Sequence, residues 1–305
     1  MKNLLNELTT EQVNPRTRHI DQMNSEQIIR LINAEDKLIA DVIEEAIPSI
    51  AAAADYIVEA FTNGGRLFYV GAGTSGRLGI LDASECPPTF GTPPSMVQGI
   101  IAGGFEAVKN PVEGAEDSEE QGIQDMIESG ITNNDVVVGI AASGRTPYVL
   151  GAMKEASRRG AKVIGLTNNP NTPMIAIADH MIEAVVGPEV ILGSTRMKSG
   201  TAQKLILNML TTTSMIRIGK VYDNLMVDLN PSNEKLVYRA KRIIRMATKA
   251  SAEEVDQAYA AAQGHVKTAI VMLLGKVDFV RAKELLAQTG GFVSQAVTLA
   301  ATKSG

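Results

Sequence analysis

Short apolar runs alternate with helix-patterned segments through the middle of the chain. The runs cover residues 66–70, 96–101, 136–140, 162–166 and 180–185, and the helical patterns lie near 75–86, 118–129, 147–159 and 173–178. Apolar strands of this length, joined through helices, are typical of a parallel sheet that is covered on both faces. The pattern therefore predicts a doubly wound α/β fold, followed by a long helix over about 197–220.

Helical patterns dominate both ends of the chain. Residues 1 to about 23 are polar and irregular, and from 25 to 61 the apolar spacing is helical, with Pro48 expected to separate two helices and Asn63-Gly64-Gly65 to end the second. After Asn230-Pro231 only helical patterns remain, near 234–248, 252–263, 266–274, 278–288 and 292–301. We expect three parts: an N-terminal arm with helices (1–56), the sheet domain (57–225) and a small all-helical domain (226–305).

A glycine turn follows the first predicted strand. Glycines 71, 73 and 76 permit a tight turn and a close approach of backbone N–H groups to a ligand, and Thr74 and Ser75 add hydroxyl groups where the next helix begins. The positive end of a helix attracts phosphate. A phosphorylated small molecule is therefore the first ligand to consider.

The same glycines satisfy the dinucleotide-binding pattern G-x-G-x-x-G, which is a weak signal when it stands alone. That pattern also expects an acidic residue at the end of the next strand, to bind the ribose. Here the next strand ends in Ala102-Gly103-Gly104, without a carboxylate. Nicotinamide or flavin binding is therefore disfavoured, and a purely structural tight turn remains an alternative.

Two further hydroxyl-bearing loops follow predicted strands. One contains Ser143 and Thr146 in Ala-Ala-Ser-Gly-Arg-Thr-Pro, and the other contains Ser194 and Thr195 in Gly-Ser-Thr-Arg-Met-Lys. Any single hydroxyl group could act only as a helix N-cap. Ligands of open parallel sheets bind outside the carboxyl ends of the strands, so three such loops at matching positions favour a phosphosugar site.

Composition excludes several classes of function. The 29 Lys and Arg against 34 Asp and Glu give a net charge of −5, and the basic residues are scattered, so neither nucleic acid nor an anionic membrane is an expected partner. A single cysteine, Cys86, suits a reducing compartment, and the three histidines lack metal-ligand spacing. With neither a signal-peptide pattern nor a membrane-length apolar run, we expect a cytoplasmic protein without a metal.

At a finer level the motifs resemble a known family. The hydroxyl loops at 73–75 and 143–146 are similar to those of sugar isomerase domains, which bind phosphosugars on a doubly wound fold. The resemblance to N-acetylmuramic acid 6-phosphate etherases is closer and covers nearly the whole chain. It rests on Glu-Cys-Pro-Pro-Thr at 85–89, Val-Glu-Gly-Ala-Glu-Asp at 112–117, the motifs at 141–147 and 194–198, Asn-Leu-Met-Val-Asp at 224–228 and Lys-Thr-Ala-Ile-Val-Met at 267–272.

The resemblance implies a lyase of cell-wall recycling that uses neither metal nor redox cofactor. It would cleave the lactyl ether of N-acetylmuramate 6-phosphate by removing the C2 hydrogen, expelling lactate from C3 and adding water there. An acid and a base suffice for this chemistry. The matching positions are Glu85 and Glu116.

Local sequence suggests which glutamate has which role. Pro87 and Pro88 are expected to end the first helix soon after Glu85, and the negative end of that helix would favour a protonated acid. Glu116 precedes a helix that begins with the apparent capping box Ser118-x-x-Gln121, whose positive end would favour an ionised base. Without the resemblance, acidic residues beside Ser118 would more simply complement a helix dipole.

Several residues are weaker candidates. Gly73, Thr74, Ser75, Ser143, Thr146, Ser194 and Thr195 would contact the phosphosugar, and Arg196 or Lys198 would bind its phosphate or its lactyl carboxylate. Lys267 matches a lysine that related regulatory proteins place on their ligand, and it lies near His265, whose role stays open. Because sugar isomerase domains usually build sites beside a subunit interface, a homodimer is expected.

Two other functions remain open at this stage. The family that the chain resembles has a non-enzymatic relative, the glucokinase regulatory protein, which binds phosphosugars and a kinase without chemistry. That protein is longer and has duplicated sugar isomerase domains, whereas this chain has room for one, and Glu85 and Glu116 favour an enzyme. An aldose–ketose isomerase on the same fold would need proton transfer between C1 and C2, but no acid directed at C3.

Overall fold

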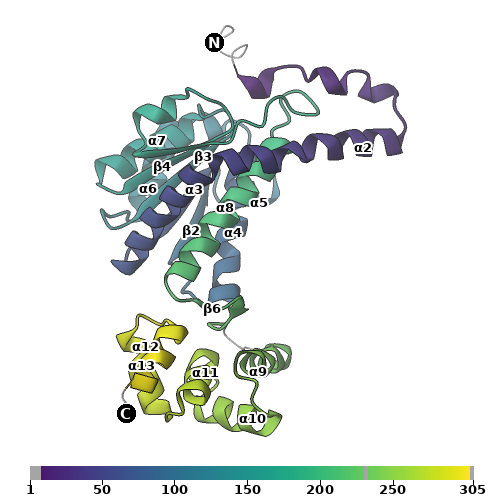
Figure 1. The fold of residues 1–305 in the computed structure, drawn as a ribbon. Coiled ribbons are helices and arrows are strands. Elements are labelled where there is room, and N and C mark those ends of the chain that lie inside the picture. Colours follow the sequence, from purple (N-terminus) through teal and green to yellow (C-terminus); the bar gives the residue numbers. More distant parts are fainter. Residues whose placement is uncertain (1–7, 230–232, 303–305) are drawn as a thin grey trace. The chain divides into compact units, whose positions relative to one another are not determined.

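Five parallel strands form the sheet at the centre of the first part of the structure (Figure 1). The computed structural model describes residues 8–229 and 233–302. The strands are β1 (Leu67–Gly71), β2 (Val97–Ile101), β3 (Val136–Ala141), β4 (Lys162–Thr167) and β5 (His180–Glu183). They lie in the order β2-β1-β3-β4-β5, so the predicted doubly wound sheet is confirmed, with a topological switch point between β1 and β3.

Helices cover both faces of this sheet. α6 (Glu119–Glu128) and α7 (Pro147–Arg158) pack against the face that carries Phe68 and Val70. α4 (Gly73–Phe90) covers the opposite face, where a Cβ on Gly79 would lie 2.8 Å from the Cβ of Tyr69. β1 and β3 are buried on both faces, and for this reason they read as continuous apolar runs in the sequence.

The N-terminal region contains two helices, but their boundary differs from the prediction. α2 (Ser25–Asp36) and α3 (Leu38–Thr62) are divided at Lys37, and Pro48 lies inside α3. An interior proline removes one backbone hydrogen bond. The cost is offset because α3 buries apolar side chains on both sides of it, including Ile43 and Ile50. α3 contacts β1, β3 and β5, and it ends at Asn63-Gly64 as expected.

Short elements connect the longer ones in this first part. They are the 3₁₀ turns η1 (Thr9–Glu11), η2 (Pro15–Thr17), η3 (Ile20–Gln22), η4 (Ala115–Asp117) and η5 (Pro173–Ala176), and the helix α5 (Glu106–Lys109). The long helix expected after β5 is α8 (Lys198–Arg217).

The C-terminal region is helical, as predicted from its periodicity. Its helices are α9 (Glu234–Thr248), α10 (Ala252–Ala261), α11 (Val266–Gly275), α12 (Phe279–Gln288) and α13 (Val293–Thr302). They enclose a core of their own that includes Ile244, Ile270 and Leu285, and a two-stranded hairpin of β6 (Val221–Tyr222) and β7 (Leu225–Met226) precedes them.

The chain divides into two compact units. The first comprises residues up to Ser84 together with Ser95–Thr211, and the second comprises Glu85–Pro94 together with the chain from Thr212 onward. The three-part division by sequence remains a prediction. Its change of pattern at Asn230-Pro231 lies outside the described residues, as do residues 1–7, on which the signal-peptide argument rests. Within the described ranges, none of the helices has the length and apolar character needed to cross a membrane.

Candidate active site

A pocket of about 620 Å³ opens at the carboxyl ends of β1 and β3, the switch point of the sheet. Its lining includes Gly73, Thr74 and Ser75 from the first loop and Ser143 and Thr146 from the second. All of its lining residues belong to the first unit. Two hydroxyl loops that lie about 70 positions apart in the sequence therefore border one cavity.

The glycine turn brings the start of α4 against the end of β1. A Cβ on Gly71 would lie 2.6 Å from the backbone nitrogen of Gly76, and a Cβ on Gly76 would lie 2.7 Å from the carbonyl oxygen of Gly71. Gly73 adopts a φ of 53°, which glycine reaches without strain. These contacts explain the glycine spacing through backbone packing, and they place the N-terminus of α4 at the pocket.

The hydroxyl group of Ser75 is held by a chain of hydrogen bonds. Its Oγ donates to Oε1 of Gln203 at 2.8 Å, and Nε2 of Gln203 donates to Oδ1 of Asn168 at 2.9 Å. The amide of Asn168 in turn donates to the carbonyl oxygen of Ala184 at 2.8 Å, which fixes the direction of the whole chain of bonds. Ser75 is thereby oriented by α8 and by the end of β4.

The second loop leaves its polar groups available. The Oγ of Ser143 accepts from the backbone N–H of Arg145 at 3.3 Å, so its own proton can be donated elsewhere. Thr146 is the N-cap of α7, yet its side chain caps no N–H group of that helix, and Pro147 occupies the first helical position. The N–H groups at the start of α7 and the two hydroxyl protons together suit an oxyanion.

Acidic side chains complete the wall of the pocket. Glu116 and Asp117 lie on η4 and both line the cavity. Ser118 is the N-cap of α6 and accepts from the N–H of Gln121 at 3.1 Å. In a full capping box, the side chain of Gln121 would also bond to the backbone N–H of Ser118. Instead, this side chain donates to Asp125 at 2.7 Å.

Glu85 lies outside the lining of this pocket. It is an exposed residue of α4 and belongs to the second unit. The expectation that Pro87 and Pro88 end the helix is wrong, because α4 continues to Phe90, and Gly91 closes its last turn with an N–H bond to the carbonyl of Pro87 at 2.9 Å. Glu85 therefore lies before the last turn of α4, where the helix dipole acts only weakly on a carboxyl group.

The third loop contributes less than the sequence suggested. Thr195 lines the pocket together with Gly193. Ser194 and the exposed Arg196 are not among the lining residues. The loop thus supplies one hydroxyl group to the cavity, and Arg196 extends from the surface.

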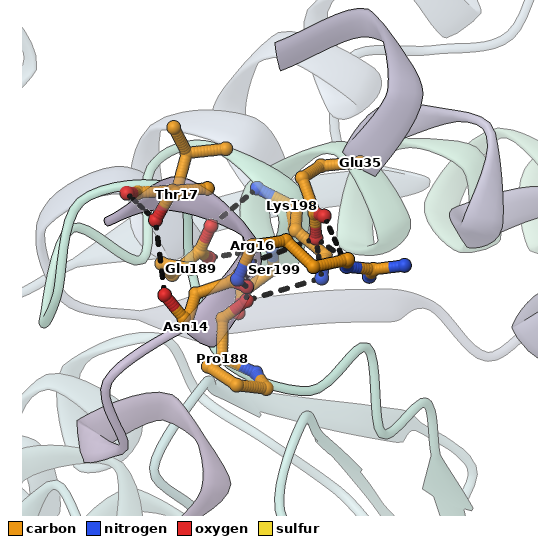
Figure 2. Close-up of polar contacts among 9 residues, drawn as sticks. Asn14, Arg16, Thr17, Glu35, Pro188, Glu189, Lys198 and Ser199 are labelled. Atoms are coloured by element: carbon orange, nitrogen blue, oxygen red, sulfur yellow. Dashed lines mark hydrogen bonds and ion pairs between the residues drawn. The ribbon is translucent and has the colours of Figure 1, made fainter. Parts of the chain in front are cut away.

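Lys198 is buried in a different place from the one expected. Figure 2 shows the carboxylate of Glu35 between Arg16 and Lys198, with Nζ of Lys198 3.0 Å from Oε2 and Nε of Arg16 2.7 Å from Oε1. The side chains of Lys198 and Glu35 are each 2% exposed. We therefore assign Lys198 to this buried ion pair and not to the pocket lining.

The same cluster holds the start of α8. The carboxylate of Glu189 accepts the backbone N–H groups of Lys198 and Ser199, both at 2.9 Å, and Asn14 donates to Glu35 at 3.0 Å (Figure 2). Burial tends to raise the pKa of Glu35, but bonds from Lys198 and Asn14 outweigh it and leave that pKa lowered.

Lys267 also has a partner within its own unit. Its Nζ lies 2.7 Å from Oδ2 of Asp228, and Nζ of Lys220 lies 3.1 Å from the same oxygen. Burial lowers the pKa of Lys267, although Asp228 opposes this shift. Lys267 has no place in the lining of the first-unit pocket.

The N-terminal arm, residues 8–17, contributes part of the pocket lining, which sequence analysis missed. Thr10 and Glu11 line the cavity. Asn169, which is fully buried after β4, accepts from the backbone and the hydroxyl of Thr9 at 2.7 and 2.9 Å and donates to Oγ1 of Thr10 at 3.0 Å. In the sequence, the polar residues Thr9, Thr10 and Glu11 were the available signal for this part of the pocket. No neighbouring residue indicates that Thr9 bonds to Asn169, 160 positions away.

Arg145 is another lining residue that the sequence-based list omitted. It lines the pocket and is the only basic residue among the described lining residues. Arg145 lies between Ser143 and Thr146 in the family motif at 141–147, and this motif could have identified it as a site residue. Searched over the described ranges, the chain shows no group of three His, Cys, Asp or Glu side chains arranged to bind a metal ion.

Comparison with family models gives two overlapping matches. Residues 49–157 match the glucokinase regulatory protein N-terminal SIS domain, and residues 105–213 match the SIS domain. Both matches contain the loop at 143–146, and the first also contains the glycine turn.

Curated relatives match over almost the whole chain. An N-acetylmuramic acid 6-phosphate etherase of Glaesserella parasuis is 55% identical over 95% of this chain and 96% of its own length. Those of Photorhabdus laumondii and Caldanaerobacter subterraneus are 53% and 52% identical, over 98% and 97% of this chain and 99% and 96% of their own lengths. At this identity and coverage, the chain belongs to the N-acetylmuramic acid 6-phosphate etherase family.

Proposed function

We propose that this protein is a lyase that cleaves the D-lactyl ether of N-acetylmuramic acid 6-phosphate, giving N-acetylglucosamine 6-phosphate and D-lactate in the recycling of cell-wall amino sugars. The observation that carries the proposal is the pocket at the switch point, which brings available hydroxyl groups and the carboxylate of Glu116 to one cavity. Family membership supports the choice of substrate.

The phosphate is best accommodated at the second loop. Ser143 and Thr146 can donate to it, and the first turn of α7 offers N–H groups and a favourable dipole. Thr74 adds a third hydroxyl group from the start of α4, and its side chain makes no hydrogen bond with the described residues. Ser75, Thr195 and Gly73 would contact the sugar from the remaining walls.

The chemistry requires proton transfer at C2 and at the ether oxygen that C3 carries. The open-chain aldehyde at C1 acidifies the C2 hydrogen, a base removes it, and an acid protonates the lactate oxygen as it leaves C3; water then adds at C3. Glu116 lines the pocket and is our candidate for the base. Glu85 is our candidate for the acid, on the strength of the family motif at 85–89. Neither step requires a cofactor.

The proposal also covers further substrate contacts, the cellular location and the oligomeric state. Ser194, Arg196 and Lys267 remain proposed substrate contacts, although none lines the first-unit pocket. We propose that the protein works in the cytoplasm, where its single cysteine stays reduced, and that it acts as a homodimer.

One assay separates the three functions considered from the sequence. Purified protein is incubated with N-acetylmuramic acid 6-phosphate, and D-lactate and N-acetylglucosamine 6-phosphate are measured. The lyase releases both in equal amounts, whereas a regulator binds the sugar phosphate unchanged, and an isomerase converts an aldose phosphate without releasing lactate. Binding without lactate release would contradict the proposal.

Variants of the two glutamates test their roles. Glu116→Gln should lose lactate release and C2 hydrogen exchange together, because elimination cannot begin without the base. Glu85→Gln should lose lactate release while C2 still exchanges with solvent. Each deficit should reach about 10²–10⁴-fold, the usual range for acid–base catalysis. Reversed behaviour would interchange the roles, and two fully active variants would exclude both residues.

A further inference from the structure

The pocket has an unusual balance of charge for a ligand of the proposed kind. Glu11, Glu116 and Asp117 line it, while Arg145 is the single basic residue of the described lining. A sugar that carries both a phosphate and a carboxylate brings further negative charge into this cavity. The carboxylates of the lining repel an anionic ligand. A single positive side chain in the same cavity therefore has a large effect on the affinity for that ligand.

The backbone holds Arg145 in a defined position. Gly144 has a φ of 64°, and a Cβ there would lie 2.4 Å from Cγ2 of Thr172, so only glycine fits the turn before Arg145. The N–H of Arg145 donates to Oγ of Ser143, and Pro147 begins α7 two residues later. The loop is thus fixed on both sides of the arginine.

Within the described part of the chain, the guanidinium group of Arg145 has no hydrogen-bond or ion-pair partner. Its Nε is buried and has no hydrogen-bond acceptor among the described residues. Two other arginines of the first unit are paired with carboxylates: Arg66 lies 2.8 Å from Asp135, and Arg16 lies 2.7 Å from Glu35. A buried donor without an acceptor is costly, and a ligand oxyanion would remove that cost.

We propose that Arg145 binds an oxyanion of the substrate, its phosphate or its lactyl carboxylate, and that it determines specificity for the anionic ligand. The inference rests on the proposed function for the identity of the ligand. It gives Arg145 the task that the sequence had suggested for Arg196 or Lys198, of which one lies outside the pocket and the other is paired with Glu35. A guanidinium group is well suited to this task because its planar fork matches an oxyanion.

The test compares Arg145→Met and Arg145→Lys with the wild type. The control is Arg30→Met, which removes the same charge from an exposed pair with Glu26 on α2. Thermal unfolding checks that each variant is folded. For Arg145→Met we expect kcat/KM for lactate release to fall about 10- to 100-fold, as for a lost hydrogen bond to a charged group. Arg145→Lys should fall less, and Arg30→Met should be unchanged.

A substrate analogue identifies the oxyanion. If the partner is the carboxylate, Arg145→Met and the wild type should act equally on the analogue whose lactyl carboxylate is a carboxamide. If the partner is the phosphate, the variant should lose as much with the carboxamide as with the natural substrate, and inhibition by inorganic phosphate should weaken. A folded Arg145→Met variant with wild-type kcat/KM on the natural substrate would overturn the inference.

Failure of the proposed function would be recognised separately, because the wild type would then release no lactate. In that case isothermal titration of the wild type and Arg145→Met with inorganic phosphate and with D-lactate tests the oxyanion site alone. Weaker binding of either anion by the variant supports the inference. Equal binding by both proteins, or no binding by the wild type, overturns it.

Discussion

The hydroxyl groups of the pocket differ in how free they are to bind a ligand. Ser75 is already committed to Gln203, through a chain of bonds whose direction is set by a backbone carbonyl. Ser143 and Thr146 have protons to donate, since the first only accepts from a backbone N–H and the second caps no group of α7. The same residue types thus have different roles, which only their partners reveal.

The free hydroxyl groups should anchor the phosphate. We predict that Ser143→Ala, Thr146→Ala and Thr74→Ala each weaken binding of the phosphosugar by about tenfold or more, because hydrogen bonds to a charged group contribute ~1.5–3 kcal/mol. Calorimetric titration measures the affinity. Thr62→Ala, an exposed helical control whose hydroxyl bonds to Val58, should bind as the wild type does. Wild-type affinity in all three variants would place the phosphate elsewhere.

At the scale of elements, buried ion pairs attach segments that are distant in sequence. The pair of Glu35 and Lys198 connects α2 to the start of α8, and the N-terminal arm joins the same cluster through Asn14 and Arg16 (Figure 2). Asn14 and Arg16 lie a few residues after Thr10, and Lys198 lies three residues after Thr195. The cluster therefore holds two segments that line the pocket.

Breaking this pair from one side should be costly. Glu35→Gln leaves the ammonium group of Lys198 buried without a counter-ion, and we predict a loss of about 3–5 kcal/mol in the free energy of unfolding of the first unit. Adding Lys198→Met should restore a large part of that loss, because the unpaired charge is then gone. Denaturant unfolding of both variants measures this. A double variant that is no more stable than Glu35→Gln would contradict the account.

Asp135 gives the first unit a dependence on pH. Burial tends to raise the pKa of Asp135, but hydrogen bonds from Arg66 and Thr132 outweigh it and leave that pKa lowered. A lowered pKa contributes stability above the unfolded value of about 3.9, and this is lost as pH falls through the folded value. The stability difference between the wild type and Asp135→Asn should therefore be largest near neutral pH and shrink toward pH 3. A difference that grows on acidification in thermal unfolding would contradict this.

Sequence patterns predicted elements that depend on local periodicity and missed features that depend on distant partners. β3 is buried on both faces, so its position could be predicted from a continuous apolar run in the sequence. Pro48 and Pro87 were expected to interrupt helices, yet each lies inside one, because packing of the surrounding turns outweighs the lost hydrogen bond. Nothing near Lys198 signals that Glu35 will neutralise it from 163 positions away.

Several large apolar side chains are exposed on the first unit. Leu81 on α4 and Met209 on α8 are 51% and 38% exposed, and Ile191 and Leu192 before α8 are each 51% exposed. Surfaces that contact another protein are typically richer in exposed apolar side chains. The exposed side chains of the first unit support the proposed homodimer, in which a twofold axis would cover the same surface on both subunits.

Assembly can be measured directly. We predict that the protein sediments as a dimer at micromolar concentration and that Met209→Lys shifts it toward monomer, because the substitution places a charge in the proposed contact. Lys204→Glu, on an exposed position of the same helix, serves as a control for a change of charge alone. A fully active wild-type monomer at these concentrations would argue against the dimer.

In the proposed mechanism, lactate is eliminated from the substrate in the pocket at the switch point, and the sugar is then rehydrated there. Reaction of the wild type with N-acetylmuramic acid 6-phosphate in water enriched in deuterium and ¹⁸O tests it most directly, with both products analysed by mass spectrometry and NMR. We predict deuterium at C2 and ¹⁸O at C3 of the sugar, with no ¹⁸O in the lactate. Lactate that carries ¹⁸O, together with a C2 that has not exchanged, would mean hydrolysis at the lactyl carbon and would contradict the mechanism.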